Sequence, residues 1–412
     1  MRVLVVDTYY AAFLNAFYAQ HRDLPLRPYA EQHRVLMEQC FGTADFYSAN
    51  LSRIGQEAIE VVSNCEQLQR QWAVEHGVKL KESGWNKVRG LVSWAPRTGS
   101  IDWFHTVLTA QVKQYSPDVL YIQDMNSLNP GFLREVKQYA RLIVGQIACP
   151  ISPGADFSEY DLILSSLPLL VEGFRRDGLA SEYFKLGFEP RVLERLSESK
   201  RSGVAFVGSL SPNHAERIGL LQKIARSVPL DVWGSGIEGL QRDSPLRTGY
   251  HGEAWALDMY QVLRNTCVAV NHHIDMAGSY ANNMRLFEAT GVGTLLVTDV
   301  KVNLTELFAP GREVVVYSTP QECVELIEYY LLHADEREAI AEAGQQRTLS
   351  EHTYYHRMQE LVEIIKRRLS SSSQVGNASY GSRDSARSTK SSGATGLEEH
   401  REIDAQRYHK GN

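Results

Sequence analysis

The chain has 412 residues, 43% of them hydrophobic and 22% charged, which is typical of a soluble globular protein with two or three domains. A net charge of -6 provides no positive field for nucleic acid, and no apolar run approaches the ~18 residues of a membrane span. The five scattered cysteines include no CxxC pair, and the start MRVLVVD does not have the pattern of a signal peptide. We therefore expect a cytoplasmic protein without a transmembrane segment or nucleic-acid partner, and leave peripheral membrane contact open.

The first half alternates short apolar runs with segments of helical period. The runs lie at 2–7, 58–63, 118–124, 141–148 and 161–166. Strands buried on both faces of a sheet have this composition, and helices between them predict a parallel sheet. The stretch 64–105 contains four tryptophans without a clear period, which predicts an insertion at one edge of this half.

A second series follows the polar segment 197–203. Its apolar runs lie at 204–210, 230–236, 268–273, 294–299 and 313–318. The pattern predicts an α/β fold with two doubly wound, Rossmann-like parallel-sheet domains that face each other across a cleft. We place these domains at residues 1–195 and 200–345, and expect a helix at 346–369 to pack back on the first domain. The Ser/Gly-rich tail at 370–412 is predicted to be disordered.

Small and polar residues follow the first two strands of the second half. Gly208 and Ser209 end one strand, and Gly234 ends the next, where the backbone can approach a diphosphate closely. Arg217 is either a cationic partner for such a ligand or a solvated side chain, and by itself the sequence favours the latter. Trp233 either borders a nucleobase or fills the core, and core filling is favoured.

The stretch NNMRLFEATGVGTLLVTD at 282–299 has an unusually polar front end for a helix before a buried strand. Asn282 or Asn283 can cap the helix, and Arg285 and Glu288 share one face. One interpretation is a capped surface helix with an ion pair. The other is a donor site, in which Arg285 neutralises a leaving diphosphate and Glu288 accepts hydrogen bonds from two ribose hydroxyls.

Other candidates end neighbouring strands. Asn271, His272 and His273 end a core strand, and their position favours the donor-site interpretation. Adjacent strand residues point to opposite faces, so we expect no paired metal ligation by the histidines. One of the two histidines can face the cleft, and His272 is the candidate for a catalytic side chain there. Asp124 and Asp7 end strands of the first half, where either is a candidate general base for an acceptor hydroxyl. Each is also an ordinary turn residue at a strand end, which is the favoured interpretation for Asp7.

These segments resemble one family. GVAFVGSL at 203–210, LDVWGSG at 230–236 and the stretch 282–299 resemble GT-B glycosyltransferases, most closely the branch with the CgeB-like (spore maturation protein-like) carboxy-terminal domain. The resemblance implies that the second domain binds a nucleotide sugar linked to UDP, GDP or dTDP, and that the first binds an unknown acceptor. It also implies that Glu288 lies near the ribose, that Gly208 and Ser209 lie near the phosphates, and that no metal or other cofactor is needed.

One departure from the family concerns the sugar. Eight residues before Glu288, retaining GT-B enzymes commonly have a second glutamate, whereas this chain has Tyr280. The sugar contacts and the stereochemical outcome therefore stay open. Two alternatives to a transferase also stay open: a sugar-nucleotide epimerase, and a non-catalytic GT-B-like module that binds a nucleotide or a partner.

Overall fold

The computed structural model describes residues 1–80, 101–198, 200–211, 215–274 and 277–380, and it describes no side chains for residues 101, 102 and 371–380. Residues 1–366 form one compact unit. The predicted insertion falls in part on residues 81–100, and most of the predicted disordered tail falls on 381–412; both segments lie outside the described residues. The two domain ranges at 1–195 and 200–345 remain predictions.

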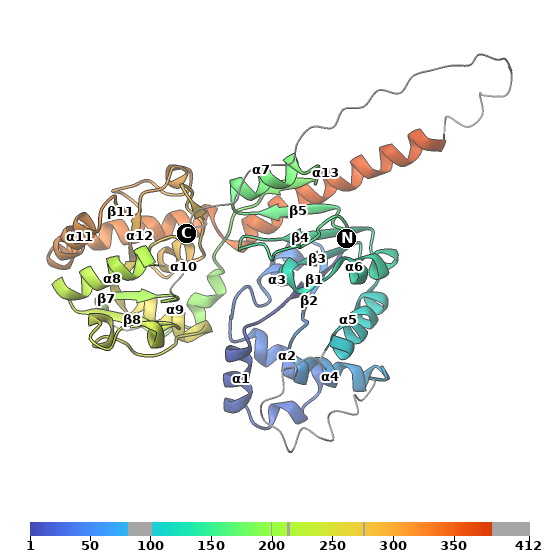
Figure 1. The fold of residues 1–412 in the computed structure, drawn as a ribbon, viewed down its shortest axis with the longest axis horizontal. Coiled ribbons are helices and arrows are strands. Elements are labelled where there is room, and N and C mark those ends of the chain that lie inside the picture. Colours follow the sequence, from blue (N-terminus) through green and yellow to red (C-terminus); the bar gives the residue numbers. More distant parts are fainter. Residues whose placement is uncertain (81–100, 199, 212–214, 275–276, 381–412) are drawn as a thin grey trace, which may run out of the picture. The chain divides into compact units, whose positions relative to one another are not determined.

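The first half of the chain forms a parallel sheet with the strand order β2-β1-β3-β4-β5-β6 (Figure 1). Its strands are β1 (Arg2–Asp7), β2 (Glu57–Val62), β3 (Val119–Ile122), β4 (Leu142–Gln146), β5 (Leu162–Ser165) and β6 (Ser181–Tyr183). The predicted runs correspond to β1 to β5. The inner residues of β1, β3, β4 and β5 are buried because helices cover both faces, whereas the edge strand β2 is buried only in its second half. The short edge strand β6 has no apolar run and was not predicted from the sequence.

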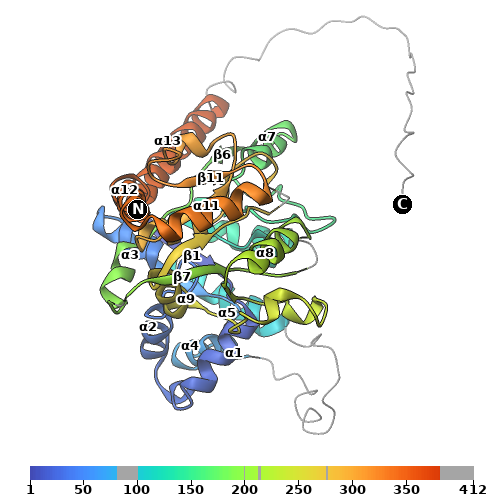
Figure 2. The same ribbon diagram turned by 90° about the vertical axis from the view of Figure 1, so that its left-hand side faces the viewer.

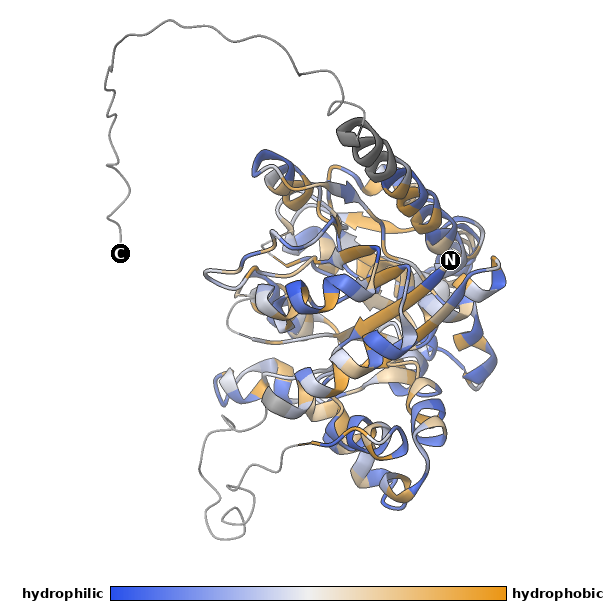
Figure 3. Cartoon of the chain, turned by 90° about the vertical axis from the view of Figure 1, so that its right-hand side faces the viewer, coloured by the Kyte–Doolittle hydropathy of each residue, from blue (hydrophilic) through white to orange (hydrophobic). Residues whose placement is uncertain are grey.

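Helices connect these strands. They are α1 (Ala11–Gln20), α2 (Tyr29–Met37), α3 (Phe46–Arg53), α4 (Glu66–Glu75), α5 (Ile101–Tyr115), α6 (Pro130–Val136) and α7 (Pro168–Arg176). Three of them, α1 to α3, lie between β1 and β2, in a segment for which no helix was predicted. In Figure 3 the strands at the centre of the molecule are mostly coloured hydrophobic, whereas the helices around them are coloured both hydrophilic and hydrophobic.

The second half forms a five-stranded parallel sheet with the order β11-β10-β9-β7-β8. Its strands are β7 (Ser202–Val207), β8 (Leu230–Trp233), β9 (Thr266–Val270), β10 (Leu295–Asp299) and β11 (Val315–Tyr317). The helices are α8 (Ala215–Ser227), α9 (Ala256–Arg264), α10 (Arg285–Gly291), α11 (Pro320–Leu332), α12 (Ala334–Glu351) and α13 (Tyr354–Tyr380) (Figure 2). The predicted α/β class with two parallel sheets is confirmed.

The chain returns to the first half at the start of α13. The Phe188 N–H donates to the His352 carbonyl at 2.8 Å, and the Tyr354 N–H donates to the Phe188 carbonyl at 2.9 Å. The Tyr354 ring then packs against Phe46 and Tyr47, with centroids 5.4 and 5.6 Å apart. These contacts fit the predicted packing of the last helix on the first half, and α13 continues to Tyr380, into the segment predicted to be disordered.

Both sheets reverse their winding direction at one point. In the first sheet β1 lies between β2 and β3, and in the second β7 lies between β8 and β9. At such a switch point the neighbouring connections leave on opposite faces, which opens a crevice at the carboxyl ends of the two strands. The ends of β1 and β3, and those of β7 and β9, are therefore the positions at which the fold favours ligand binding.

Among the described residues, no helix is both long enough and apolar enough to cross a membrane.

Candidate active site

Residues from both halves of the chain line a cavity of about 450 Å³, which we call the central cavity. The first half contributes Asp7, Thr8, Tyr47 and Asp124, and the second contributes Trp255, Tyr260 and Glu288. Tyr354, at the start of α13, completes its wall. Glu288, the residue predicted to bind the ribose, therefore lines the same cavity as Asp7 and Asp124, the two candidate general bases.

Glu288 is buried on α10, with 5% of its surface exposed. Arg285 Nη1 lies 2.8 Å from its Oε2, one helical turn earlier on the same face. Burial raises the pKa of Glu288, and the charge of Arg285 opposes that rise. Only 15% of the Arg285 side chain is exposed, so the pair is not the solvated surface pair that one interpretation of the sequence predicts.

The amino end of α10 is already bonded within the protein. Asn283 Oδ1 accepts from the Leu286 N–H at 3.2 Å, which confirms its predicted capping role. The Phe287 and Glu288 N–H groups both donate to the Met284 carbonyl at 2.9 Å. The helix has seven residues, and its first turn offers a ligand few free N–H groups. A contribution of this helix to a donor site would therefore come from its side chains.

Arg217 on α8 is buried, with 7% of its surface exposed, which corrects its interpretation as a solvated side chain. Its Nη1 donates to the Ser209 carbonyl at 3.2 Å and its Nη2 to the His272 carbonyl at 2.9 Å. The guanidinium thus joins the loops after β7 and β9, the two strands that flank the switch point. A rigid fork with several donors can hold two carbonyls at once, which explains why an arginine occupies this position.

Gly208 and Gly234 allow two loops to approach each other closely. A Cβ atom on Gly234 would lie 1.9 Å from the Gly208 carbonyl oxygen, and the Gly234 φ of +140° also disfavours other residues. The Gly208 N–H donates to the Trp233 carbonyl at 2.9 Å. Trp233 itself is half-buried and stacks on His251 at 4.6 Å, so it does not fill the core as the sequence favoured.

The two histidines lie beyond the end of β9, which ends at Val270. Because they are not strand residues, the prediction that they point to opposite faces is wrong. His273 Nδ1 lies 2.6 Å from Asp299 Oδ1, and His272 Nδ1 lies 3.9 Å from Oδ2 of the same carboxylate. Burial acts to raise the pKa of Asp299, but the side-chain bond to His273 and the electrostatic effect of its neighbours, among them Lys301, hold that pKa below its ordinary value. Burial lowers the pKa of His272, and the nearby Asp299 carboxylate opposes this effect.

Asn271 is buried and fully engaged. Its Oδ1 accepts from Asn283 Nδ2 at 2.7 Å, and its Nδ2 donates to Thr298 Oγ1 at 2.9 Å. The amide therefore ties the segment before α10 to the ends of β9 and β10. The geometry makes Asn271 and Asn283 positioning residues for the helix that carries Glu288.

The two aspartates of the first half lie at its switch point. Asp7 ends β1, and Asp124 follows β3. Asp124 accepts from Thr8 Oγ1 at 2.7 Å and from the Asn126 N–H at 3.2 Å. Burial raises the pKa of Asp7 to about 7, the Thr8 N–H opposes the rise, and the nearby Asp124 charge adds to it.

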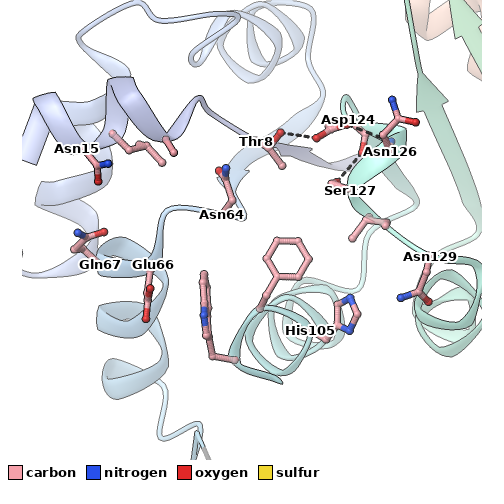
Figure 4. Close-up of a pocket in the computed structure, with 15 residues that line it drawn as sticks. Thr8, Asn15, Asn64, Glu66, Gln67, His105, Asp124, Asn126, Ser127 and Asn129 are labelled. Atoms are coloured by element: carbon pink, nitrogen blue, oxygen red, sulfur yellow. Dashed lines mark hydrogen bonds between the residues drawn. The ribbon is translucent and has the colours of Figure 1, made fainter. Parts of the chain in front are cut away.

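A second cavity of about 620 Å³ lies within the first half, and we call it the first-half cavity. Figure 4 shows Thr8 and Asp124 at its upper edge, Asn15 and Gln67 on one side, and Asn129 on the other. Thr8 and Asp124 line both cavities, so the two adjoin at the carboxyl ends of β1 and β3.

The structure brings some predicted residues together and leaves others apart. Asp124 and Glu288 share the central cavity, but the other predicted donor residues do not line it. Of those others, Gly208, Ser209, Arg217, Trp233, Gly234, Asn271 and Asn283 lie on and around the loops after β7, β8 and β9, and Arg285 lies at the start of α10. The sequence did not single out the aromatic wall of Trp255, Tyr260 and Tyr354, since aromatic residues in helices usually fill a core.

Among the residues that the structure describes, no three His, Cys, Asp or Glu side chains gather in a group able to hold a metal ion.

The comparisons with known proteins match this architecture. Residues 217–363 match the model of the glycosyl transferase-like family. The structure of HepE from Anabaena, in complex with UDP and glucose, superposes with a TM-score of 0.54 at 12% identity, covering 89% of this chain and 100% of that one. Sucrose-phosphate synthase from Thermosynechococcus elongatus gives a TM-score of 0.53 at 10% identity, covering 90% and 100%.

A glycosyltransferase from Rickettsia africae gives a TM-score of 0.54 at 9% identity, covering 89% of this chain and 98% of that one. No curated protein sequence matches the chain. The likeness to solved structures shows the fold, and the family match covers a segment of the second half that includes Glu288. The chain therefore has the GT-B fold, and its residues 217–363 match the glycosyl transferase-like family.

Proposed function

We propose that the chain transfers a sugar from a nucleotide-sugar donor, bound by its second half, to a hydroxyl group of an acceptor bound by its first half. One observation carries this proposal: Glu288 and Asp124, from opposite halves, line the same cavity. Ligands of parallel α/β sheets bind at switch points, and the central cavity adjoins the switch point of the first sheet.

The donor nucleotide is assigned to Glu288 and to the loops after β7 and β9. A carboxylate has paired acceptors for the two hydroxyls of a ribose, and Glu288 has one ion-pair partner, Arg285, among the described residues. In this proposal Arg285 offsets the charge that develops on the diphosphate, and Gly208 and Ser209 lie beside the phosphates. Since HepE was solved with UDP and glucose, UDP-glucose is the first donor to test.

Asp124 is the proposed general base of an inverting displacement. The acceptor oxygen forms a bond to the anomeric carbon while the bond from that carbon to the diphosphate oxygen breaks. The nucleoside diphosphate leaves with the bonding electron pair, and the acceptor proton passes to the Asp124 carboxylate and then to solvent. Thr8, which donates to Asp124 at 2.7 Å, fixes the direction of the carboxylate. The positive charge of Arg285 takes the role that a metal ion has in other transferases.

Three narrower assignments belong to the same proposal. Membership of the CgeB-like branch rests on the sequence resemblance, as does a role in glycan biosynthesis. A cytoplasmic location rests on the five cysteines, all of which have free thiols in the structure.

A thermal-shift screen with UDP, GDP, dTDP and their sugar conjugates tests the donor site. A ligand that binds only the native state at about 100 times its Kd stabilises the protein by about 2.7 kcal/mol. We expect one nucleotide to raise the Tm, and its sugar conjugate to release nucleotide slowly in water. Binding without any release would favour a non-catalytic module, and interconversion of sugar isomers would favour an epimerase. A flat screen would overturn the proposal.

A further inference from the structure

The side chains that line the first-half cavity limit the chemical class of acceptor that can bind there. It adjoins the central cavity through Thr8 and Asp124, so a hydroxyl of a molecule bound there would reach the proposed general base. The inference below rests on the proposed function and specifies the acceptor class for the same site.

Primary amides surround this cavity (Figure 4). Asn15, Asn64, Gln67, Asn126 and Asn129 all line it. An amide presents two donors and one acceptor with two lone pairs, and a hydroxyl likewise donates and accepts, so the two groups suit each other without charge. The amides of Asn15 and Gln67 are exposed and have no hydrogen-bond partner among the described residues.

Three of the five amides are already partly engaged. Asn64 exchanges hydrogen bonds with the Tyr9 backbone at 2.9 and 2.8 Å, and Asn129 Oδ1 accepts from the Phe132 N–H at 2.9 Å. Asn126 Nδ2 donates to the Pro150 carbonyl at 3.2 Å. These bonds hold three amides of the wall in place, so the cavity presents a polar surface that is partly organised before a ligand binds.

The charge of the lining excludes one class of acceptor. No Lys or Arg lines the cavity in the described part of the chain, whereas Glu66 and Asp124 both do. Arg70, the nearest cation to Glu66, is paired with it at 2.8 Å. The third titratable residue, His105, has its pKa lowered by burial and carries no charge at pH 7. A phosphate, sulfate or carboxylate on the acceptor would meet net negative charge.

Aromatic and apolar side chains form the rest of the wall. Trp103 and Phe104, at the start of α5, line the cavity together with Leu14 and Leu128. His105 stacks on Phe132 at 5.0 Å, which fixes its ring. Small-molecule sites combine aromatic surface with a few placed polar groups in volumes of ~300–1,000 Å³, and this cavity of about 620 Å³ falls in that range. Sugar rings, which have apolar C–H faces and hydroxyl edges, match both parts of the lining.

We propose that the first-half cavity binds a neutral saccharide, the end of a glycan or a glycoside, as the acceptor of the transferase. Its C–H faces lie on the aromatic wall and its hydroxyls bond to the amides, with one hydroxyl directed at Asp124. Acceptors whose recognised group is a phosphate or carboxylate are disfavoured at this site.

Saturation-transfer difference NMR on the full chain, without nucleotide, tests the proposal directly. The probes are neutral saccharides (maltose, cellobiose, lactose and diacetylchitobiose) and anionic ones (glucose 6-phosphate and glucuronate). We expect at least one neutral saccharide to bind more tightly than both anionic ones. In the variant with Asn15→Ala and Gln67→Ala its Kd should rise on the order of tenfold, from the loss of two hydrogen bonds. The control, with Gln138→Ala and Gln321→Ala, changes two exposed glutamines outside the cavity and should keep the wild-type Kd.

Three results would overturn the inference: no neutral saccharide binds, the anionic probes bind more tightly, or the Asn15/Gln67 variant binds like the control. Titration of the same samples with UDP, GDP and dTDP separates this inference from the function on which it rests. Nucleotide binding without saccharide binding removes the acceptor assignment alone. Saccharide binding without any nucleotide binding counts against the transferase proposal.

Discussion

Arg285 and Glu288 form a buried ion pair, with 2.8 Å between Nη1 and Oε2, on the helix that borders the central cavity. Removal of one partner leaves the other buried without compensation, which typically costs about 3–5 kcal/mol. A loss of activity in either single variant would therefore mix a stability effect with a binding effect. The pair is best tested by removing both charges together.

The variant with Arg285→Met and Glu288→Gln should unfold at a temperature close to that of the wild type and lose most of its nucleotide affinity. The single change Arg285→Met should be clearly less stable than this double variant. Calorimetry and nucleotide titration measure the two effects separately. Removal of the exposed pair of Glu363 and Lys366, with the same spacing, is the control and should change neither quantity. Wild-type nucleotide affinity in the double variant would show that the pair is structural only.

The Asp124→Asn variant should keep nucleotide affinity and lose turnover by a factor of about 10²–10⁴, the usual contribution of a general base. The amide still fits beside Thr8 but cannot take the proton. Initial rates of nucleotide release with acceptor present give the measurement. Asp156, which like Asp124 accepts a backbone N–H from the second residue after it, provides a matched control in Asp156→Asn. Equal turnover in both variants would rule out Asp124 as the base.

The Arg217→Met variant should lower the free energy of unfolding by about 3 kcal/mol, because two hydrogen bonds from a charged donor to backbone carbonyls are lost. Nucleotide affinity should fall as well, since the loops after β7 and β9 lose their common partner. Denaturant unfolding followed by nucleotide titration checks both. Arg226→Met, at an exposed position of the same helix, should stay within about 0.5 kcal/mol of the wild type.

A methyl group at Gly234 has no room, because it would lie 1.9 Å from the Gly208 carbonyl oxygen. Gly234→Ala should therefore separate the loops after β7 and β8 and reduce both stability and nucleotide binding. Gly219, inside α8, has no atom within 4 Å of such a methyl group, and Gly219→Ala should stabilise the helix by about 0.5–1 kcal/mol. Melting temperatures that change in the same direction for both variants would contradict this structure of the loops.

The buried carboxyl of Asp7 should make stability fall as pH rises. Its pKa is about 7 in the folded chain and 3.8 in the unfolded one, so between about pH 4 and 7 only the folded chain holds the proton. Each pH unit in this window then costs about 1.4 kcal/mol of unfolding free energy. Asp7→Asn should flatten this slope by that amount, whereas Asp177→Asn, at an exposed position, should leave it unchanged. Unfolding by urea at several pH values gives the slope. A slope in Asp7→Asn equal to that of the wild type would contradict the burial of this proton.

The sequence by itself determined the fold class and the strands at its centre. The runs that became β1 and β10 are apolar on both faces, a local property that requires burial on both sides and hence a parallel sheet covered by helices. It also offered Asn282 or Asn283 as a cap, because capping involves a bond to a residue only a few positions away, and Asn283 makes that bond. The three helices α1 to α3 were not predicted from the sequence.

Only the tertiary structure decided which residues meet. Arg217 has the sequence pattern of a solvated side chain on a helix, yet its partners are the carbonyls of Ser209 and His272, which are distant in sequence. Tyr354 reaches the wall of the central cavity because the chain returns to the first half after α12. Contacts between distant segments depend on the strand order and on the path of the connections. The hydrophobic period of a single segment gives no information about either. The amides that line the first-half cavity could not be predicted as a group for the same reason, because α1, α4 and the segment after β3 come together only in the folded chain.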